Sequence, residues 1–141
     1  MNDKFFLDTN VLVYAFDRRS PAKLRIAENL ISRALQGEGC IASQVVQEFI
    51  NVALTKFKPA LREADLREFL RRCLMPLCAV FPSEELYERA IDTHSRYRLS
   101  WYDALIIASA QSAGVKTLYS EDFTPGSQYG SLTVVDPFKA Q

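Results

Sequence analysis

The stretch Phe5-Phe6-Leu7-Asp8-Thr9-Asn10-Val11-Leu12 joins two apolar runs through an acid and two polar residues. The first run has the length of a short buried strand, and the second continues to Phe16 with helical spacing. This pattern predicts a strand that ends at Asp8, followed by a turn and a helix. Outward from here the sequence predicts further strands over 40–42, 77–81, 115–119 and 132–135, and helices over 21–35, 44–57, 62–74, 84–97 and 101–112. Because strands alternate with helices, we expect a three-layer α/β fold with a mostly parallel central sheet flanked by helices.

Composition sets limits on the possible functions. The chain has 141 residues, 48% of them hydrophobic, and no repeat or linker, so we expect a single domain over residues 1–141. Its 17 basic and 17 acidic residues cancel, so only a local patch could attract a polyanion. The N-terminus lacks a signal-peptide layout and no uncharged apolar stretch approaches about 20 residues, so we expect a cytoplasmic protein without a membrane segment. Cys40, Cys73 and Cys78 lack metal-binding spacing and are expected to be reduced core cysteines.

Four acids on separate predicted elements are expected at one edge of this sheet. Asp8 ends the first strand, and Glu48 lies in the second turn of the helix that follows strand 40–42. Asp103 begins the helix that leads into strand 115–119, and Asp122 follows the end of that strand. Ligands of open parallel sheets bind beyond the carboxyl ends of the strands, which is where these elements deliver their acids.

A group of carboxylates indicates a metal site, because neighbouring negative charges repel unless a cation neutralises them. Oxygen ligands completed by water suit Mg²⁺ or Mn²⁺, whereas zinc favours His and Cys. One or two such ions could activate water and neutralise a departing oxygen, which is the chemistry of phosphodiester hydrolysis.

Each acid also has an ordinary structural explanation. Asp8 could cap the following helix, and Asp103 has the Ser-x-x-Asp spacing of a capping box with Ser100. Glu48 could be a solvated surface acid, although no Lys or Arg lies three or four residues away to pair with it. Asp122 lies in a loop, where acids are common. Four such explanations at the same edge are less plausible than one shared function.

The motifs that carry these acids closely resemble the PIN domain, and in size and motif order the chain resembles VapC-type toxins. The resemblance extends from Phe5 to Phe138. Its motifs are residues 5–12, Ser-Gln-Val-Val-Gln-Glu-Phe at 43–49, Leu-Ser-Trp-Tyr-Asp-Ala-Leu-Ile-Ile-Ala-Ser-Ala at 99–110, Leu-Tyr-Ser-Glu-Asp-Phe at 118–123 and Val-Val-Asp-Pro-Phe at 134–138.

This resemblance implies a role for each site residue. The metal-holding and catalytic acids would be Asp8, Glu48, Asp103 and Asp122, with polar support from Thr9, Asn10 and Ser100. Glu121 beside Asp122 leaves open which of the two is the fourth acid, although the Ser-x-Asp register favours Asp122. The resemblance also implies a five-stranded Rossmann-like sheet, a Mg²⁺- or Mn²⁺-dependent endoribonuclease, a homodimer, and neutralisation by a small antitoxin.

The acid set and the apolar patterns suggest three functions. For a ribonuclease, the candidate RNA contacts nearest the acidic edge are Arg18, Arg19, Arg96 and Arg98. An aspartyl-phosphate phosphohydrolase would need a second acid two residues after Asp8, where this chain has Asn10. A catalytically weak binding protein could present apolar surface from a helical hairpin that contains Phe57, Leu61, Leu66, Phe69, Leu70 and Leu74.

Overall fold

The centre of the molecule is a six-stranded sheet with strand order β3-β2-β1-β4-β6-β5, seen in a computed structural model that describes residues 3–139. The expected domain limits, residues 1 and 141, lie outside this range. Strands β1, β2, β3, β4 and β6 are parallel, and β5 is antiparallel to β6. The strands are β1 (Phe5–Leu7), β2 (Gly39–Ala42), β3 (Cys78–Val80), β4 (Thr117–Tyr119), β5 (Gln128–Tyr129) and β6 (Leu132–Val135).

The expected sheet of five strands is corrected to six. The additional strand, β5, has two residues and pairs with β6 through a tight reversal in which Gly130 has φ +64°. Glycine adopts this left-handed conformation without a Cβ clash, so the chain can fold back at this position. Two residues are too few to produce a period-two pattern, which is why the sequence predicted a loop here.

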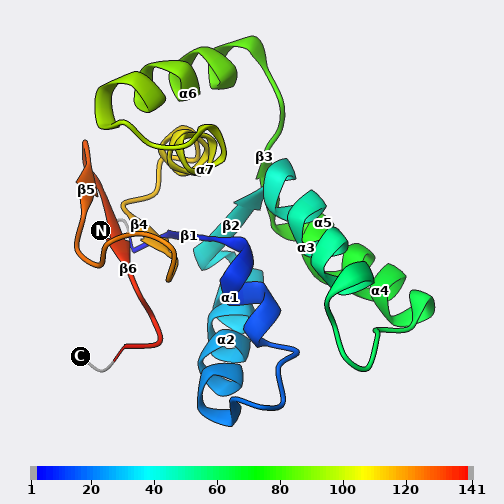
Figure 1. Ribbon diagram of the computed structural model, residues 1–141. Helices are drawn as coiled ribbons and strands as arrows, with labels where there is room; N and C mark the ends of the chain where they lie inside the picture. The colour runs from blue at the N-terminus through cyan, green and yellow to red at the C-terminus, as the bar shows by residue number, and fades with distance from the viewer. Residues whose placement is uncertain (1–2, 140–141) are drawn as a thin grey trace.

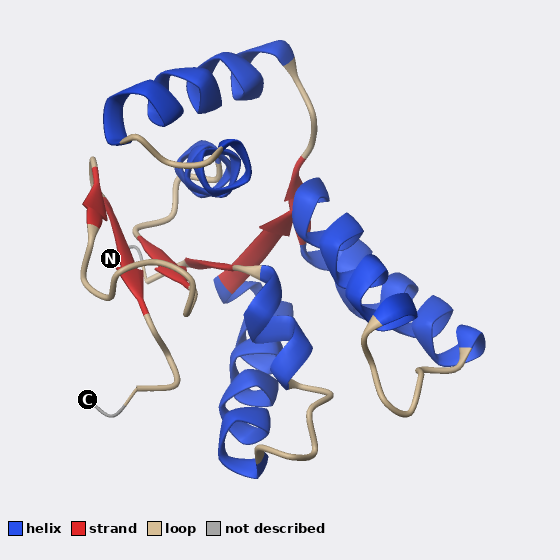
Figure 2. Ribbon diagram, viewed as in Figure 1, coloured by secondary structure: helices blue, strands red, loops and turns tan. Residues whose placement is uncertain are grey.

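Helices cover both faces of the sheet, as the α/β prediction requires (Figure 1). Figure 2 shows α6 and α7 on one side of the strands and α1 with α2 on the other, with α3 to α5 beside them. The helices are α1 (Thr9–Tyr14), α2 (Pro21–Arg33), α3 (Ser43–Thr55), α4 (Glu63–Phe69), α5 (Met75–Leu77), α6 (Glu84–Tyr97) and α7 (Trp101–Ser112), with π-helical segments η1 (Ala34–Glu38) and η2 (Leu70–Leu74). Within residues 3–139, no helix combines the length and apolarity needed to cross a bilayer.

The helical region from Glu63 extends further than predicted. We expected the helix to end at Leu74, before Pro76 and a strand over 77–81, but η2 continues into α5, which contains Pro76. Proline inside a helix removes one backbone hydrogen bond, and the chain is π-helical directly before it, where the Met75 N–H bonds to the Leu70 carbonyl. The strand therefore begins at Cys78.

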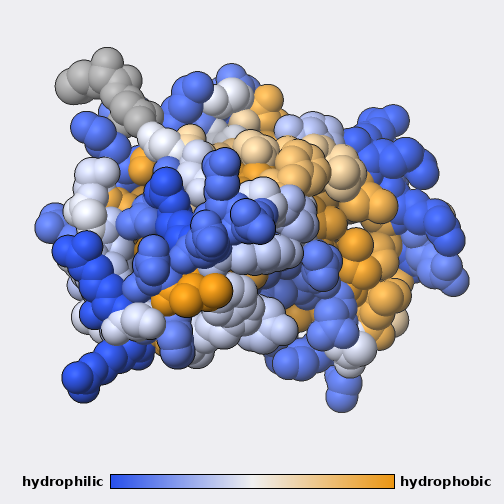
Figure 3. Space-filling model, turned by 90° about the horizontal axis from the view of Figure 1, so that it is seen from above, coloured by the Kyte–Doolittle hydropathy of each residue, from blue (hydrophilic) through white to orange (hydrophobic). Residues whose placement is uncertain are grey.

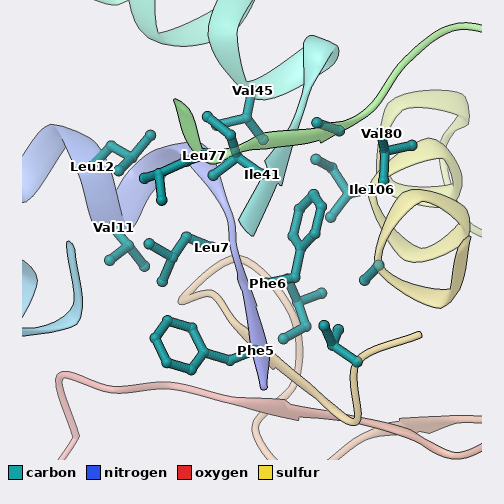
Figure 4. Packing of buried hydrophobic residues seen from close by; sticks show 14 of the residues in the cluster. Phe5, Phe6, Leu7, Val11, Leu12, Ile41, Val45, Leu77, Val80 and Ile106 are labelled. Carbon is teal, nitrogen blue, oxygen red and sulfur yellow. The ribbon is translucent and has the colours of Figure 1, made fainter. Parts of the chain in front are cut away.

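The core forms around β1, whose three residues are all buried. Figure 4 shows Phe6 directed toward Ile106 of α7, whereas Phe5 and Leu7 point to the opposite face, where Val11 of α1 lies. Successive side chains of a strand alternate between faces, so this short strand contributes to both layers of the core. Helix α7 is buried continuously from Ala104 to Ala110, as its nearly uniform apolar sequence predicts.

The three cysteines are free thiols, as expected. Cys73 is buried, and Cys40 and Cys78 are partly buried. Burial raises the thiol pKa of Cys40 and of Cys73 to about 11, which makes both thiols unreactive at neutral pH.

Candidate active site

Asp8 lies at the carboxyl end of β1 and is the N-cap of α1. Its side chain is directed into the protein, and only 5% of the residue is exposed. Oδ1 accepts a 2.7 Å hydrogen bond from the Thr9 backbone N–H, and Oδ2 accepts a 2.7 Å hydrogen bond from the Ser120 hydroxyl. The capping role and a possible functional role are therefore compatible, because the cap uses only one of the two oxygens.

Burial changes the acidity of Asp8. Desolvation raises the pKa of its carboxyl from the ordinary value of 3.8 to about 7, against the opposing effect of the Ser120 and Thr9 hydrogen bonds. The negative charges of Asp122 and Glu48 raise this pKa further. A carboxylate that is costly to ionise, beside two other acids, is a position where a cation would stabilise the charged form.

Asn10 joins the ends of β1 and β4. Its Nδ2 donates to Asp122 Oδ2 at 3.0 Å and to Ser120 Oγ at 3.2 Å, and lies 3.5 Å from Asp8 Oδ2. Its Oδ1 accepts a 3.3 Å hydrogen bond from the Glu121 N–H, and Ser120 Oγ accepts one of 3.1 Å from the Asp122 N–H. This network places Asp122 beside Asp8, although the two residues are far apart in the sequence.

Glu48 comes to the same place from α3, four residues after Gln44. The Thr9 hydroxyl donates a 2.6 Å hydrogen bond to Glu48 Oε1, and Gln44 Nε2 donates one of 3.2 Å to Oε2. Both oxygens of Glu48 are thus oriented by neutral donors rather than by a Lys or Arg.

Asp103 lies in the first turn of α7, where the helix macrodipole favours a negative charge. Its backbone N–H donates a 3.2 Å hydrogen bond to the Ser100 hydroxyl, which caps the helix as the Ser-x-x-Asp spacing predicted. Within residues 3–139, no side chain or backbone group donates a hydrogen bond to the Asp103 carboxylate. Its two oxygens therefore remain available to a ligand.

Glu121 is held by a different set of residues from Asp122. Tyr14 Oη donates a 2.8 Å hydrogen bond to Glu121 Oε1, and Lys23 Nζ forms an ion pair with Oε2 at 3.5 Å. Both Glu121 oxygens are therefore engaged toward α1 and α2. The Asp122 carboxylate instead contacts Asn10, in the network around Asp8.

One cleft of about 510 Å³ contains all four predicted acids, together with Thr9, Asn10 and Glu121. Ser100 does not line this cleft; its hydroxyl acts through the capping bond to Asp103. The cleft is also lined by Tyr14, Gln44 and Tyr102, which sequence reasoning did not identify. Gln44 could have been found because it precedes Glu48 by one helical turn, and Tyr102 because it directly precedes Asp103.

The predicted basic residues are not gathered at the cleft. Arg19 lines it, and its guanidinium is paired with Asp17 at 3.0 Å. Arg18, Arg96 and Arg98 are exposed and lie outside the described cleft lining. The role of all four in RNA binding stays a prediction.

The donor set fits a hard divalent cation, because the acids offer only oxygen ligands and no cationic side chain in residues 3–139 pairs with Asp8, Glu48, Asp103 or Asp122. No three His, Cys, Asp or Glu side chains of this range are arranged to hold a metal ion directly. Mg²⁺ usually keeps several waters and takes only one or two protein carboxylates, so an open site of this kind suits it better than a closed cage would.

Comparison with known proteins identifies the fold family. Residues 5–124 match the PIN domain, and no curated protein is significantly similar in sequence. A toxin–antitoxin complex from Klebsiella pneumoniae is 22% identical with a TM-score of 0.67, and the match covers 97% of this chain and 100% of that one. FitAcB from Neisseria gonorrhoeae is 20% identical with a TM-score of 0.66, covering 96% and 99%. The sarcin-ricin loop cleaving toxin VapC20 of Mycobacterium tuberculosis is 18% identical with a TM-score of 0.58, covering 84% and 90%.

These three similarities concern the fold, whereas the family match rests on the sequence and spans 120 of the 141 residues. PIN domains are generally nucleases. The chain belongs to the PIN domain family.

Proposed function

We propose that this protein is a Mg²⁺- or Mn²⁺-dependent endoribonuclease that acts as the toxin of a toxin–antitoxin pair. The observation that carries the proposal is the nearly buried carboxylate of Asp8, which shares one cleft with Glu48, Asp103 and Asp122. Toxin–antitoxin complexes among proteins of similar fold support the toxin role, and one of these relatives is a toxin that cleaves the sarcin-ricin loop. RNA, a small antitoxin and a second copy of this chain are the proposed partners.

Asp8 and Asp103 would hold the ion directly, with Glu48 and Asp122 completing the site through water. When bound, the ion would activate a water molecule and neutralise charge on the phosphate. Thr9, Asn10 and Ser120 orient the carboxylates through the hydrogen bonds described above. The positive end of the α7 macrodipole lies at Asp103 and favours binding of the negatively charged phosphate in the cleft.

Two alternative functions find less support. An aspartyl-phosphate mechanism requires an acid two residues after Asp8, but Asn10 uses its amide to donate to Asp122 and Ser120. Trapping of a phosphorylated Asp8 would revive that mechanism.

The binding-protein hypothesis placed apolar surface on the hairpin around α4. Leu66 and Leu74 are buried there, and Phe57, Leu61, Phe69 and Leu70 are packed against the core. Figure 3 nevertheless shows hydrophobic surface on the side formed by α3 to α5. Exposed large hydrophobic side chains of these helices include Leu54 of α3 and Met75 of α5. This surface is compatible with the proposed partners and does not require that catalysis be lost.

The test is cleavage of a mixed RNA pool by the purified protein with Mn²⁺, with Mg²⁺ and with EDTA. Asp103→Asn should reduce the metal-dependent rate by about 100-fold or more, since a catalytic ion supplies several kcal/mol of transition-state stabilisation. Asp92→Asn, an exposed acid on α6 outside the cleft lining, is the matched control and should cleave normally. Cleavage that survives EDTA or Asp103→Asn would contradict the proposal.

A further inference from the structure

We propose that Gln44 is a positioning residue of the carboxylate cleft, which holds Glu48 in place against the first turn of α7. The inference rests on the proposed metal-dependent function. It gives a role to Gln44, which is neither one of the four acids nor one of the polar residues predicted to support them.

The Gln44 side chain bridges two elements of the site. Its Nε2 donates to Glu48 Oε2 at 3.2 Å and to the backbone carbonyl of Tyr102, also at 3.2 Å. Gln44 lies in the first turn of α3, and Tyr102 directly precedes Asp103 in the first turn of α7. One amide group therefore links the helix that carries Glu48 to the helix that carries Asp103.

Both partners of the amide are acceptors, which settles its orientation. If the amide were flipped, its oxygen would face a carboxylate and a carbonyl oxygen, and both contacts would be repulsive. In the observed orientation both N–H bonds of Nε2 are used. An ordinary glutamine–acid pair one turn apart on a helix surface would use only one of them.

The amide oxygen indicates that this arrangement has a cost. Gln44 Oε1 is buried and has no hydrogen-bond partner within residues 3–139. The amide nitrogen, in contrast, has two acceptors, Glu48 Oε2 and the Tyr102 carbonyl. The two hydrogen bonds of Nε2 determine the Gln44 rotamer, and in this rotamer Oε1 has no partner in residues 3–139.

Glu48 is held from both sides as a result. The Thr9 hydroxyl donates to Glu48 Oε1 at 2.6 Å, and Thr9 directly follows Asp8. Gln44 Nε2 donates to Glu48 Oε2 and also to the carbonyl of Tyr102, which directly precedes Asp103. The carboxylate of Glu48 is thereby oriented relative to the two other acids by neutral donors, before any cation binds. Outer-shell hydrogen bonds of this type commonly change metal affinity by about 10- to 100-fold when they are removed.

The test compares Gln44→Met with Gln47→Met. Methionine has a similar length and cannot donate, and Gln47 is an exposed glutamine of the same helix that does not line the cleft. Mn²⁺ alone is titrated into each protein by calorimetry at pH 8, and the Mn²⁺ concentration that gives half-maximal RNA cleavage is measured separately. Thermal unfolding in EDTA reports whether each variant is folded.

We expect Gln44→Met to weaken Mn²⁺ binding by about tenfold and to raise the half-maximal Mn²⁺ concentration by a similar factor. Saturating Mn²⁺ should restore most of the cleavage rate of Gln44→Met. It would not restore the rate of a variant that is inactive because it is misfolded. If Gln44→Met does not fold, Gln44→Asn retains an amide one methylene too short to reach both acceptors and should show the same loss of affinity.

Two negative outcomes are distinguishable. If the wild-type protein binds Mn²⁺ and the Gln44 variants bind it as tightly as Gln47→Met, the positioning role is wrong and the proposed function stands. If the wild-type protein itself binds no Mn²⁺ and cleaves no RNA, the proposed function is wrong, and the inference about Gln44 is overturned with it.

Discussion

The Ser120 hydroxyl donates a 2.7 Å hydrogen bond to Asp8 Oδ2, joining the ends of β4 and β1 across 112 positions of sequence. Ser120 is fully buried and Asp8 nearly so. The hydrogen bond stabilises the ionised carboxylate and lowers its pKa, while burial, the larger effect, raises it. Ser120 therefore favours the ionised form of Asp8, which is the form that the proposed role as a metal ligand requires.

Replacing Ser120 by Ala should raise the pKa of Asp8 above its present value of about 7. A hydrogen bond to a charged group is worth about 1.5–3 kcal/mol, which corresponds to a rise of roughly one to two pH units. The pH at which Mn²⁺ binding is half complete should move upward by a similar amount, measured by titration at several pH values. Ser109→Ala is the control, because Ser109 is equally buried and its hydroxyl has no partner in residues 3–139. Equal profiles for the two variants would contradict the assigned role of Ser120.

The stability of the metal-free protein should fall as the pH rises through the range in which Asp8 ionises. Its pKa is raised in the folded state from 3.8 to about 7, so the folded protein binds this proton more tightly than the unfolded chain does. The contribution of Asp8 to the free energy of unfolding is fully present below about pH 4 and is lost as the pH rises through about 7. Its magnitude is on the order of 4 kcal/mol.

The Asp8→Asn variant should remove this dependence, because an amide of the same shape does not ionise. We expect its free energy of unfolding, measured with urea in EDTA, to exceed that of the wild type at pH 8. The difference between the two proteins should be smaller at pH 4. Mn²⁺ at pH 8 should stabilise the wild type much more than Asp8→Asn. A parallel pH dependence of the two proteins in EDTA would show that Asp8 ionises normally.

Asp122, rather than Glu121, should be the fourth acid of the site. Asp122 contacts Asn10 in the network around Asp8, while Glu121 is engaged by Tyr14 and Lys23. Asp122→Asn should lower Mn²⁺ affinity and RNA cleavage by about tenfold or more, and Glu121→Gln should have a smaller effect on both. The two isosteric variants serve as controls for each other, and the reverse order of effects would assign the position to Glu121.

Arg19 should contribute more to RNA affinity than Arg98, because Arg19 lines the cleft and Arg98 does not. RNA binding can be measured over a range of salt concentrations in Ca²⁺ to limit cleavage. If Arg19 contacts one phosphate, Arg19→Ala should reduce the salt slope by about one, and Arg98→Ala should leave it unchanged. Equal reductions would mean that the RNA extends over the turn between α6 and α7.

Much of the fold could be predicted from periodicity and chain breaks. The strand at Phe5, the helix from Trp101 and the final strand from Leu132 were located closely, because each contrasts in hydrophobic pattern with its neighbours. The two-residue β5 and the continuation of the helix through Pro76 were missed, because a pattern that short has no period and a proline normally ends a helix.

The sequence by itself determined that Asp8, Glu48, Asp103 and Asp122 would lie at one edge of a parallel sheet, since the carboxyl ends of parallel strands and the helix starts above them share that edge. Only the tertiary structure decided how these acids are held. The bonds from Ser120 to Asp8, from Thr9 to Glu48 and from Gln44 to Tyr102 join residues 112, 39 and 58 positions apart. Side-chain orientation, burial and the resulting pKa depend on such long-range contacts, which leave no local pattern in the sequence.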